Sequence, residues 1–223
     1  MEIDLSNIGM EKGQQYETII TTTDKNGNPN AAPFGLRVLD KDKIQLRIFE
    51  GGNSIKNIKD NGMFVVNVTE NPMMFTLATI DTIPQEHLTK IDNNTKGNGE
   101  LFYLTKADAY FICEVETLKS AFRENDPIKD TEINMIKANA VELNMNNKCA
   151  RPINRGIHAL IEALVNYSRI DIVDEEKQKY FLERFLESER IIKRVGDKEE
   201  KESIQLLKED LKKQGFEIQY SGY

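Results

Sequence analysis

Hydrophobic and polar positions alternate along the first two thirds of the chain in short runs that are typical of β-strands. The run 16–23 is dense in β-branched residues and stops before Asn26-Gly27, a dipeptide that readily takes the positive φ of a hairpin turn. The run 63–69 is almost continuously apolar, as expected for a strand buried on both faces. Six runs predict a small antiparallel barrel, with strands at 16–23, 31–39, 44–50, 63–69, 109–119 and 132–143.

The pattern changes to a helical period in the last third of the chain. Asn154, Asp174 and Asp197 are suitable N-caps for three successive helices. The first of these helices carries apolar residues at the spacing of one stripe, namely Ile157, Leu160, Ile161, Leu164 and Val165. We therefore predict a mainly β plus α fold, with a β-barrel domain over 1–148 and a small helical domain over 149–223.

The predicted strand 31–39 has two different faces. One face is apolar and consists of Ala32, Phe34, Leu36 and Val38. The other face begins with small residues and ends with a cationic one, and it consists of Ala31, Pro33, Gly35 and Arg37. A flat ligand would lie close to the backbone on the small face, with Arg37 reaching over it. An edge strand also explains this pattern, because Pro33 cannot donate a ladder hydrogen bond, and the two interpretations are compatible.

Two glycines, Gly51 and Gly52, join the predicted strand 44–50 to the start of a short helix. A helix N-terminus offers unpaired backbone N–H groups and a partial positive charge, and glycine lets the backbone approach an anion closely. Ser54 would add a hydroxyl group and Lys56 a full charge. The pattern predicts a phosphate-binding turn, while the alternative that Ser54 is an ordinary helix N-cap stays open.

Three other segments complete the pattern. Asn67 and Thr69 are polar exceptions on one face of the strand 63–69, and Asn67 is kept as a candidate cofactor-binding residue. The segment 72–80 predicts either a short helix or an irregular apolar stretch. The Asn- and Gly-rich segment 93–99 predicts a loop.

Composition narrows the classes of function. The chain of 223 residues has a formal net charge of −7, which argues against a general nucleic-acid or anionic-membrane binder. Cys113 and Cys149 have no metal-type spacing, so we predict two reduced, buried thiols and no metal site. No signal peptide or membrane-length apolar segment is visible, so a soluble cytoplasmic protein is expected. His87 and His158 occupy polar positions and are not expected to be catalytic.

The order of these elements resembles a known superfamily. Asn30-Ala31-Ala32-Pro33-Phe34-Gly35, Ser54-Ile55-Lys56 and Val65-Val66-Asn67-Val68 resemble the split barrel that binds flavin mononucleotide (FMN) in the flavin reductase and pyridoxamine phosphate oxidase superfamily. The segment Arg151-Pro152-Ile153-Asn154-Arg155-Gly156 resembles, more narrowly, an uncharacterised archaeal family (DUF447-like) in which such a barrel precedes a helical domain. The narrower resemblance covers nearly the whole chain.

The resemblance implies a homodimer with FMN bound near the subunit interface. The residues that it implies at the cofactor are Ser54 and Lys56 at the phosphate, and Pro33, Phe34, Gly35, Arg47 and Phe49 along the ring. Asn154 and Arg155 have two interpretations. Arg155 is either a surface charge at a helix start, or, with Asn154, it points to an anion such as the flavin phosphate or the substrate across an interface.

The implied chemistry belongs to the flavin, so no catalytic side chain is assigned. We expect a flavin reductase-like oxidoreductase whose FMN takes electrons from a nicotinamide or deazaflavin donor and passes them to a small acceptor. A non-catalytic flavin-binding or sensing module is the alternative, and a dimeric scaffold without a cofactor is a third reading. The sequence has no Gly-x-Gly-x-x-Gly or Walker element, so a nicotinamide partner would bind transiently.

Overall fold

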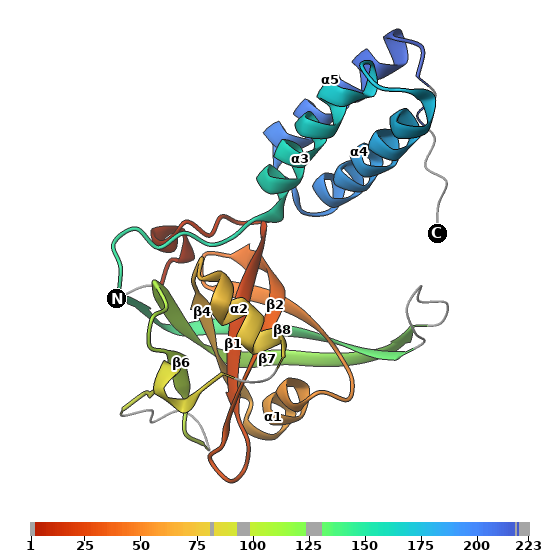
Figure 1. The fold of residues 1–223 in the computed structure, drawn as a ribbon. Helices are drawn as coiled ribbons and strands as arrows, with labels where there is room; N and C mark the ends of the chain where they lie inside the picture. The colour runs from red at the N-terminus through yellow and green to blue at the C-terminus, as the bar shows by residue number, and fades with distance from the viewer. Residues whose placement is uncertain (1–2, 81–82, 93–98, 124–130, 217, 219–223) are drawn as a thin grey trace. The chain divides into compact units, whose positions relative to one another are not determined.

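The structure is a computed structural model that describes residues 3–80, 83–92, 99–123, 131–216 and 218 (Figure 1). The chain divides into two compact units, Met1–Ile153 and Asn154–Tyr223. This division lies slightly later than the predicted boundary between 148 and 149. The difference arises because the backbone N–H of Glu17 donates to the carbonyl oxygen of Ile153 at 2.7 Å, which ties the end of the linking segment to the first unit.

The first unit contains a closed barrel of six strands in the order β1-β2-β3-β8-β7-β4. Every neighbouring pair is antiparallel, which confirms the predicted barrel. The strands are β1 (Gln15–Thr23), β2 (Pro29–Asp40), β3 (Lys43–Phe49), β4 (Met63–Val68), β7 (Ala109–Arg123) and β8 (Thr131–Met145).

The barrel encloses a hydrophobic core to which every strand contributes. Six core residues, one from each strand and none more than 1% exposed, are Ile20, Leu36, Leu46, Phe64, Phe111 and Ile136. Helix α1 (Asn53–Asn61) directs Ile55 and Ile58 into the same core and ends at Gly62, whose φ is 68°. Because the helix is held by its buried face, the position of its N-terminus is fixed against the barrel.

Shorter elements lie around the barrel. They are η1 (Leu5–Ile8), α2 (Pro72–Thr79), η2 (Gln85–His87) and a two-stranded sheet of β5 (Leu88–Lys90) and β6 (Phe102–Leu104). Of the two structures expected for 72–80, the helix is the one that forms. Asn71 caps it by accepting hydrogen bonds from the backbone N–H groups of Met73 and Met74. The loop predicted over 93–99 falls, apart from Gly99, outside the described residues.

The described residues of the second unit form three helices, as predicted: α3 (Arg155–Ile170), α4 (Glu175–Val195) and α5 (Lys198–Lys213). The predicted N-caps Asn154, Asp174 and Asp197 each accept a backbone hydrogen bond from the first turn of their helix. The helices bury a core of their own, which includes Ala163, Ile170, Phe185, Ile192 and Ile204.

The two cysteines have different environments. Cys113 is buried as expected, and burial raises the pKa of its thiol well above the ordinary value. The expectation of a buried Cys149 was wrong, because this residue lies in the exposed segment that follows β8. Among the described residues, no helix has the length and apolar character needed to cross a membrane.

Candidate functional site

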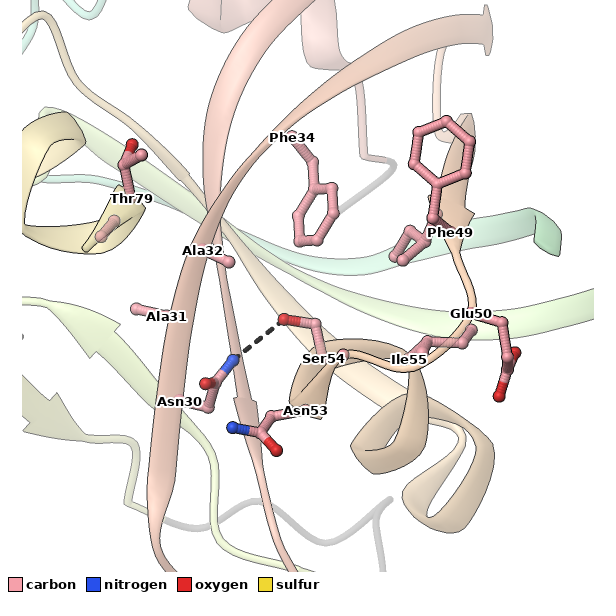
Figure 2. Close-up of a pocket in the computed structure, with 13 residues that line it drawn as sticks. Asn30, Ala31, Ala32, Phe34, Phe49, Glu50, Asn53, Ser54, Ile55 and Thr79 are labelled. Atoms are coloured by element: carbon pink, nitrogen blue, oxygen red, sulfur yellow. Dashed lines mark hydrogen bonds between the residues drawn. The ribbon is translucent and has the colours of Figure 1, made fainter. Parts of the chain in front are cut away.

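The barrel is split where β2 separates from β3. Pairing between the two strands begins at Leu36 with Leu46 and continues toward their hairpin, so the first half of β2 pairs with β1 alone. A cavity of about 420 Å³ lies at this opening, between β2, the end of β3, the start of α1 and the end of α2 (Figure 2). We call it the seam cavity. It is lined by Asn30, Ala31, Ala32, Phe34, Ile48, Phe49, Glu50, Gly52, Asn53, Ser54, Ile55, Ala78 and Thr79.

One side of the seam cavity is apolar. Phe34 from β2 and Phe49 from the end of β3 lie at the same side of the cavity in Figure 2, and Ala32 contributes only a methyl group beside them. Phe34 packs partly on the barrel core, whereas 47% of Phe49 is exposed. An exposed aromatic ring beside a small, apolar strand surface suits a flat ligand, because stacking buries a large area on both partners.

The other side of the seam cavity is the N-terminus of α1. The N-cap is Gly52, which has extended backbone angles, and no side chain caps this helix end. Gly51 before it has φ 101°, a conformation that favours glycine. A Cβ atom at either glycine would meet no atom within 4 Å, so the space over the first turn is open. The first-turn N–H groups are therefore placed to receive an anion.

A partly buried polar pair joins β2 to the helix start. The Nδ2 group of Asn30 donates to Oγ of Ser54 at 2.9 Å, and Ser54 is only 4% exposed. Because Ser54 accepts this bond, its own O–H remains able to donate. The N-cap interpretation of Ser54 was wrong: the helix begins at Asn53, because the extended Gly52 takes the capping position.

Sequence reasoning missed Asn30 and Asn53 as cavity residues. Asn30 lies two residues before Ala32 and four before Phe34, so it continues the face that the alternation identified as apolar, opposite the face on which a flat ligand was predicted. That alternation was the signal that could have found it. Asn53 carried no comparable signal, because a polar residue at a helix start is common.

Among the described residues that line the seam cavity, Glu50 is the one ionisable residue. Its carboxylate accepts hydrogen bonds from Nζ of Lys59 and Nδ2 of Asn134, both at 2.7 Å, and it points away from the cavity in Figure 2. The Lys59 contact, followed by that of Asn134, lowers the pKa of Glu50. The polar side of the cavity therefore presents neutral donors, and its one carboxylate is engaged elsewhere.

The predicted cationic residues lie outside the cavity lining. Lys56 is exposed on α1, where its charge contributes to lowering the pKa of Asp24, after the larger effect of hydrogen bonds from Asn28. Arg37 is exposed, and its Nε donates to the carbonyl oxygen of Gly13 at 3.1 Å. Arg47 is exposed on β3 with its guanidinium carbon 5.8 Å from the centroid of the Phe49 ring.

Pro33 and Gly35 occupy the face of β2 that is opposite Phe34, and neither lines the seam cavity. Glu17 of β1 is directly opposite Gly35, and a Cβ atom at Gly35 would lie 2.9 Å from Nε2 of Gln15. Side chains of β1 thus crowd the Gly35 end of the small face on which the sequence had placed a flat ligand, whereas Ala31 at the other end of this face lines the seam cavity.

Asn67 is fully buried and has a structural role in the barrel. Its Nδ2 group donates to the carbonyl oxygen of Ile19 at 3.0 Å and to Oγ1 of Thr21 at 3.2 Å, and its Oδ1 accepts from the backbone N–H of Leu104 at 2.7 Å. These bonds attach β6 to the barrel. Asn67 is not among the residues that line the seam cavity.

Asn154 and Arg155 begin the second unit. Asn154 accepts from the N–H of Gly156 at 2.6 Å and donates to the carbonyl oxygen of Val195 at 3.0 Å, so it joins the start of α3 to the end of α4. A Cβ atom at Gly156 would lie 2.8 Å from the Cα of Gly196. The Asn-Arg-Gly segment therefore packs the helices of this unit closely, while Arg155 is exposed.

The part of the chain that the structure describes holds no cluster of three or more His, Cys, Asp or Glu residues suited to a metal ion. Its histidines lie outside the seam cavity lining. The arrangement offers backbone N–H groups and a hydroxyl group for an anion, with aromatic rings for a flat group. It offers no general base of its own.

Comparisons with known proteins agree with this architecture. Residues 16–147 match the family described as protein of unknown function (DUF447), N-terminal domain, and residues 154–209 match protein of unknown function (DUF447). Uncharacterized protein MJ1453 of Methanocaldococcus jannaschii is 24% identical over 197 residues, which are 86% of this chain and 96% of that protein.

Two solved structures illustrate the range of similar folds. The FMN-bound protein MM1853 from Methanosarcina mazei, a DUF447 protein, is 23% identical with a TM-score of 0.51, and the match covers 92% of this chain and 99% of that one. Nitrilotriacetate monooxygenase component B from Bacillus cereus is 16% identical with a TM-score of 0.47, over 64% of this chain and 74% of that one. The two family matches together span both units, and the chain belongs to the DUF447 family.

Proposed function

We propose that this chain binds FMN in the seam cavity and acts as a flavin-dependent oxidoreductase. The observation that carries the proposal is the meeting of an uncapped helix N-terminus and two aromatic walls in one cavity of about 420 Å³. That volume lies within the range of small-molecule sites. FMN combines a phosphate with a flat ring, so it matches both sides of the cavity.

The residues present fit such a group. The first-turn N–H groups of α1 and the hydroxyl of Ser54 would hold the phosphate, and the open space over Gly51 and Gly52 would admit it. Phe34 and Phe49 would flank the ring. Asn30 keeps Ser54 in place through their 2.9 Å hydrogen bond, so the phosphate site is preorganised.

The comparisons support the same cofactor. The Methanosarcina protein of similar fold is described as FMN-bound, and its match to this chain extends over 92% of the residues. The homodimer that the resemblance implies is part of the proposal.

When bound, FMN would supply transfer of a hydride or of single electrons, and the protein would orient the reactants. Glu50 holds its charge toward Lys59 and Asn134, so it is not positioned to exchange a proton in the cavity. The apolar walls would exclude water from one side of the bound ring. The chain's own contribution is therefore binding and orientation.

Fluorescence titrations with FMN and with riboflavin, which lacks the phosphate, test the cofactor site. We expect the wild type to prefer FMN, and Ser54→Ala to weaken FMN by about 10- to 100-fold while leaving riboflavin nearly unchanged, since a hydrogen bond to a charged group is worth about 1.5–3 kcal/mol. Ser203→Ala is the matched control, because Ser203 donates only to the carbonyl oxygen of Glu199 on α5.

A wild-type protein that binds neither flavin would refute the proposal. Rapid reduction of the bound flavin by a nicotinamide or deazaflavin donor, with turnover of an added acceptor, would support the oxidoreductase. Tight FMN binding with slow reduction by every donor would instead favour a flavin-binding or sensing module.

A further inference from the structure

A second hollow of about 360 Å³ lies on the outer face of β3, β8 and β7. Strand pairing explains how it forms: Gln45, Lys137 and Thr117 share one row across the three strands, and Arg47, Met135 and Lys119 share the next. A register shift between Val115 and Thr117 displaces Glu116 beside these rows. The hollow is lined by Lys43, Gln45, Glu116, Thr117, Lys119, Met135 and Lys137, and we call it the lysine hollow.

The lysine hollow is positively charged in a chain whose net charge is −7. Glu116 is its only acidic lining residue, and it pairs with Lys43 at 2.9 Å, which raises the pKa of that lysine. Lys119 and Lys137 have no ion-pair partner among the described residues. Two neighbouring ammonium groups that form no ion pair with a described residue attract an anion, and Gln45 and Thr117 add neutral hydrogen-bonding groups.

The outer face of β3 connects the lysine hollow to the seam cavity. Lys43, Gln45, Arg47 and Phe49 alternate with core residues and so share that face. Phe49 lines the seam cavity, Gln45 lines the lysine hollow, and Arg47 lies between them with its guanidinium carbon 5.8 Å from the Phe49 ring centroid. Phe49 lies four positions after Gln45 along the strand, which is roughly 13 Å.

We propose that the lysine hollow binds the phosphate-type negative charges of the molecule that exchanges electrons with the flavin, while the other end of that molecule reaches the seam cavity at Phe49. This proposal rests on the proposed function and names the substrate class: a small organic molecule with a diphosphate or an equivalent pair of anionic groups. Lysine ammonium groups suit phosphate as point charges, and Met135 gives the hollow an apolar floor.

The test compares Lys119→Gln/Lys137→Gln with Lys148→Gln/Lys179→Gln, a control that removes the same charge from exposed positions outside the hollow. The first probe is inorganic pyrophosphate, measured by calorimetry on the FMN-loaded protein. We expect the pyrophosphate Kd to rise at least tenfold in the hollow variant and less than twofold in the control. Added salt should weaken wild-type binding steeply.

The second measurement distinguishes an effect on binding of the donor's anionic tail from an effect on its reacting ring. NADPH and 1-benzyl-1,4-dihydronicotinamide carry similar reducing rings, but only NADPH carries phosphates. The hollow variant should raise KM for NADPH at least tenfold with little change in kcat, and should leave the benzyl compound unaffected. Equal effects on both donors would overturn the proposal.

Two further results would also overturn it. One is a wild-type protein that does not bind pyrophosphate, or a hollow variant that binds it as the wild type does. The other is a changed association state of the hollow variant in sedimentation velocity, which would make the hollow an interface between copies. Failure of the proposed function would be seen separately, because the wild type would then not bind FMN.

Discussion

The two glycines at the ends of α1 allow cofactor binding and stability to be perturbed separately. Gly52→Ala places a methyl group at the N-cap, inside the seam cavity, where it would meet no protein atom within 4 Å. Gly62→Ala places the same group at the C-cap, where φ is 68° and a side chain is strained. The two variants add identical atoms to opposite ends of one helix.

The two variants should differ in their effect on the free energy of unfolding. At Gly52 the backbone is extended, with φ −90°, so alanine causes no strain there. The loss of a favourable N-cap costs about 0.5–1 kcal/mol, and the smaller entropy of the unfolded chain offsets it by about 0.4–1 kcal/mol, so stability should change by less than about 0.5 kcal/mol. At Gly62 the left-handed backbone should cost about 1–2 kcal/mol.

Cofactor affinity should show the opposite order. A methyl group over the first turn would displace the phosphate from at least one backbone N–H, a loss of about 1.5–3 kcal/mol or about 10- to 100-fold in Kd. Gly62→Ala should leave the FMN Kd within about twofold. Urea unfolding of the flavin-free protein and fluorescence titration with FMN measure the two quantities. Equal FMN affinity in Gly52→Ala and the wild type would refute the phosphate site at this helix end.

Three further predictions concern the scaffold. Asn67→Leu should lower the free energy of unfolding measured in urea by about 3 kcal/mol, because it strands buried partners such as the Leu104 N–H, and titration of the folded variant with FMN should show an unchanged stoichiometry. Gly156→Ala should lower the melting temperature of the helical unit by several degrees in calorimetry, since its Cβ would lie 2.8 Å from the Gly196 backbone. Burial acts to raise the pKa of Glu189, but hydrogen bonds from Lys193 and Lys208 outweigh it and the pKa is lowered. The resulting stability is present above the ordinary value of 4.5 and is lost as pH falls through the lowered pKa, so Glu189→Gln should flatten the acid limb of thermal stability against pH.

Local signals allowed much of the fold to be predicted. Asn154, Asp174 and Asp197 were identified as caps because capping depends on residues within one helix turn. Where local patterns did not determine the end of an element, contacts between segments distant in the sequence determined it. Strands β7 and β8 extend to Arg123 and from Thr131, beyond the predicted runs, because their mutual pairing continues through polar positions.

The candidate site was predicted in part, for the same reason. Ser54 was found through the helix start, and Phe34 and Phe49 through the family resemblance, and all three line the seam cavity. Asn30 was missed because its role depends on a partner 24 residues away. Asn67 was predicted to be a cofactor-binding residue because an isolated polar group in an apolar strand has the same signature whether it binds a ligand or another strand.

The separation of β2 from β3 divides one strand into two regions with different selective constraints. Leu36 and Val38 are 1% exposed, so substitutions there act on folding of the barrel. Asn30, Ala32 and Phe34 line the cavity on the half of β2 that pairs with β1 alone, so under the proposed function substitutions there act mainly on recognition. Lineages of this family would therefore be able to diversify their ligands at one end of β2 while the other end continues to maintain the barrel.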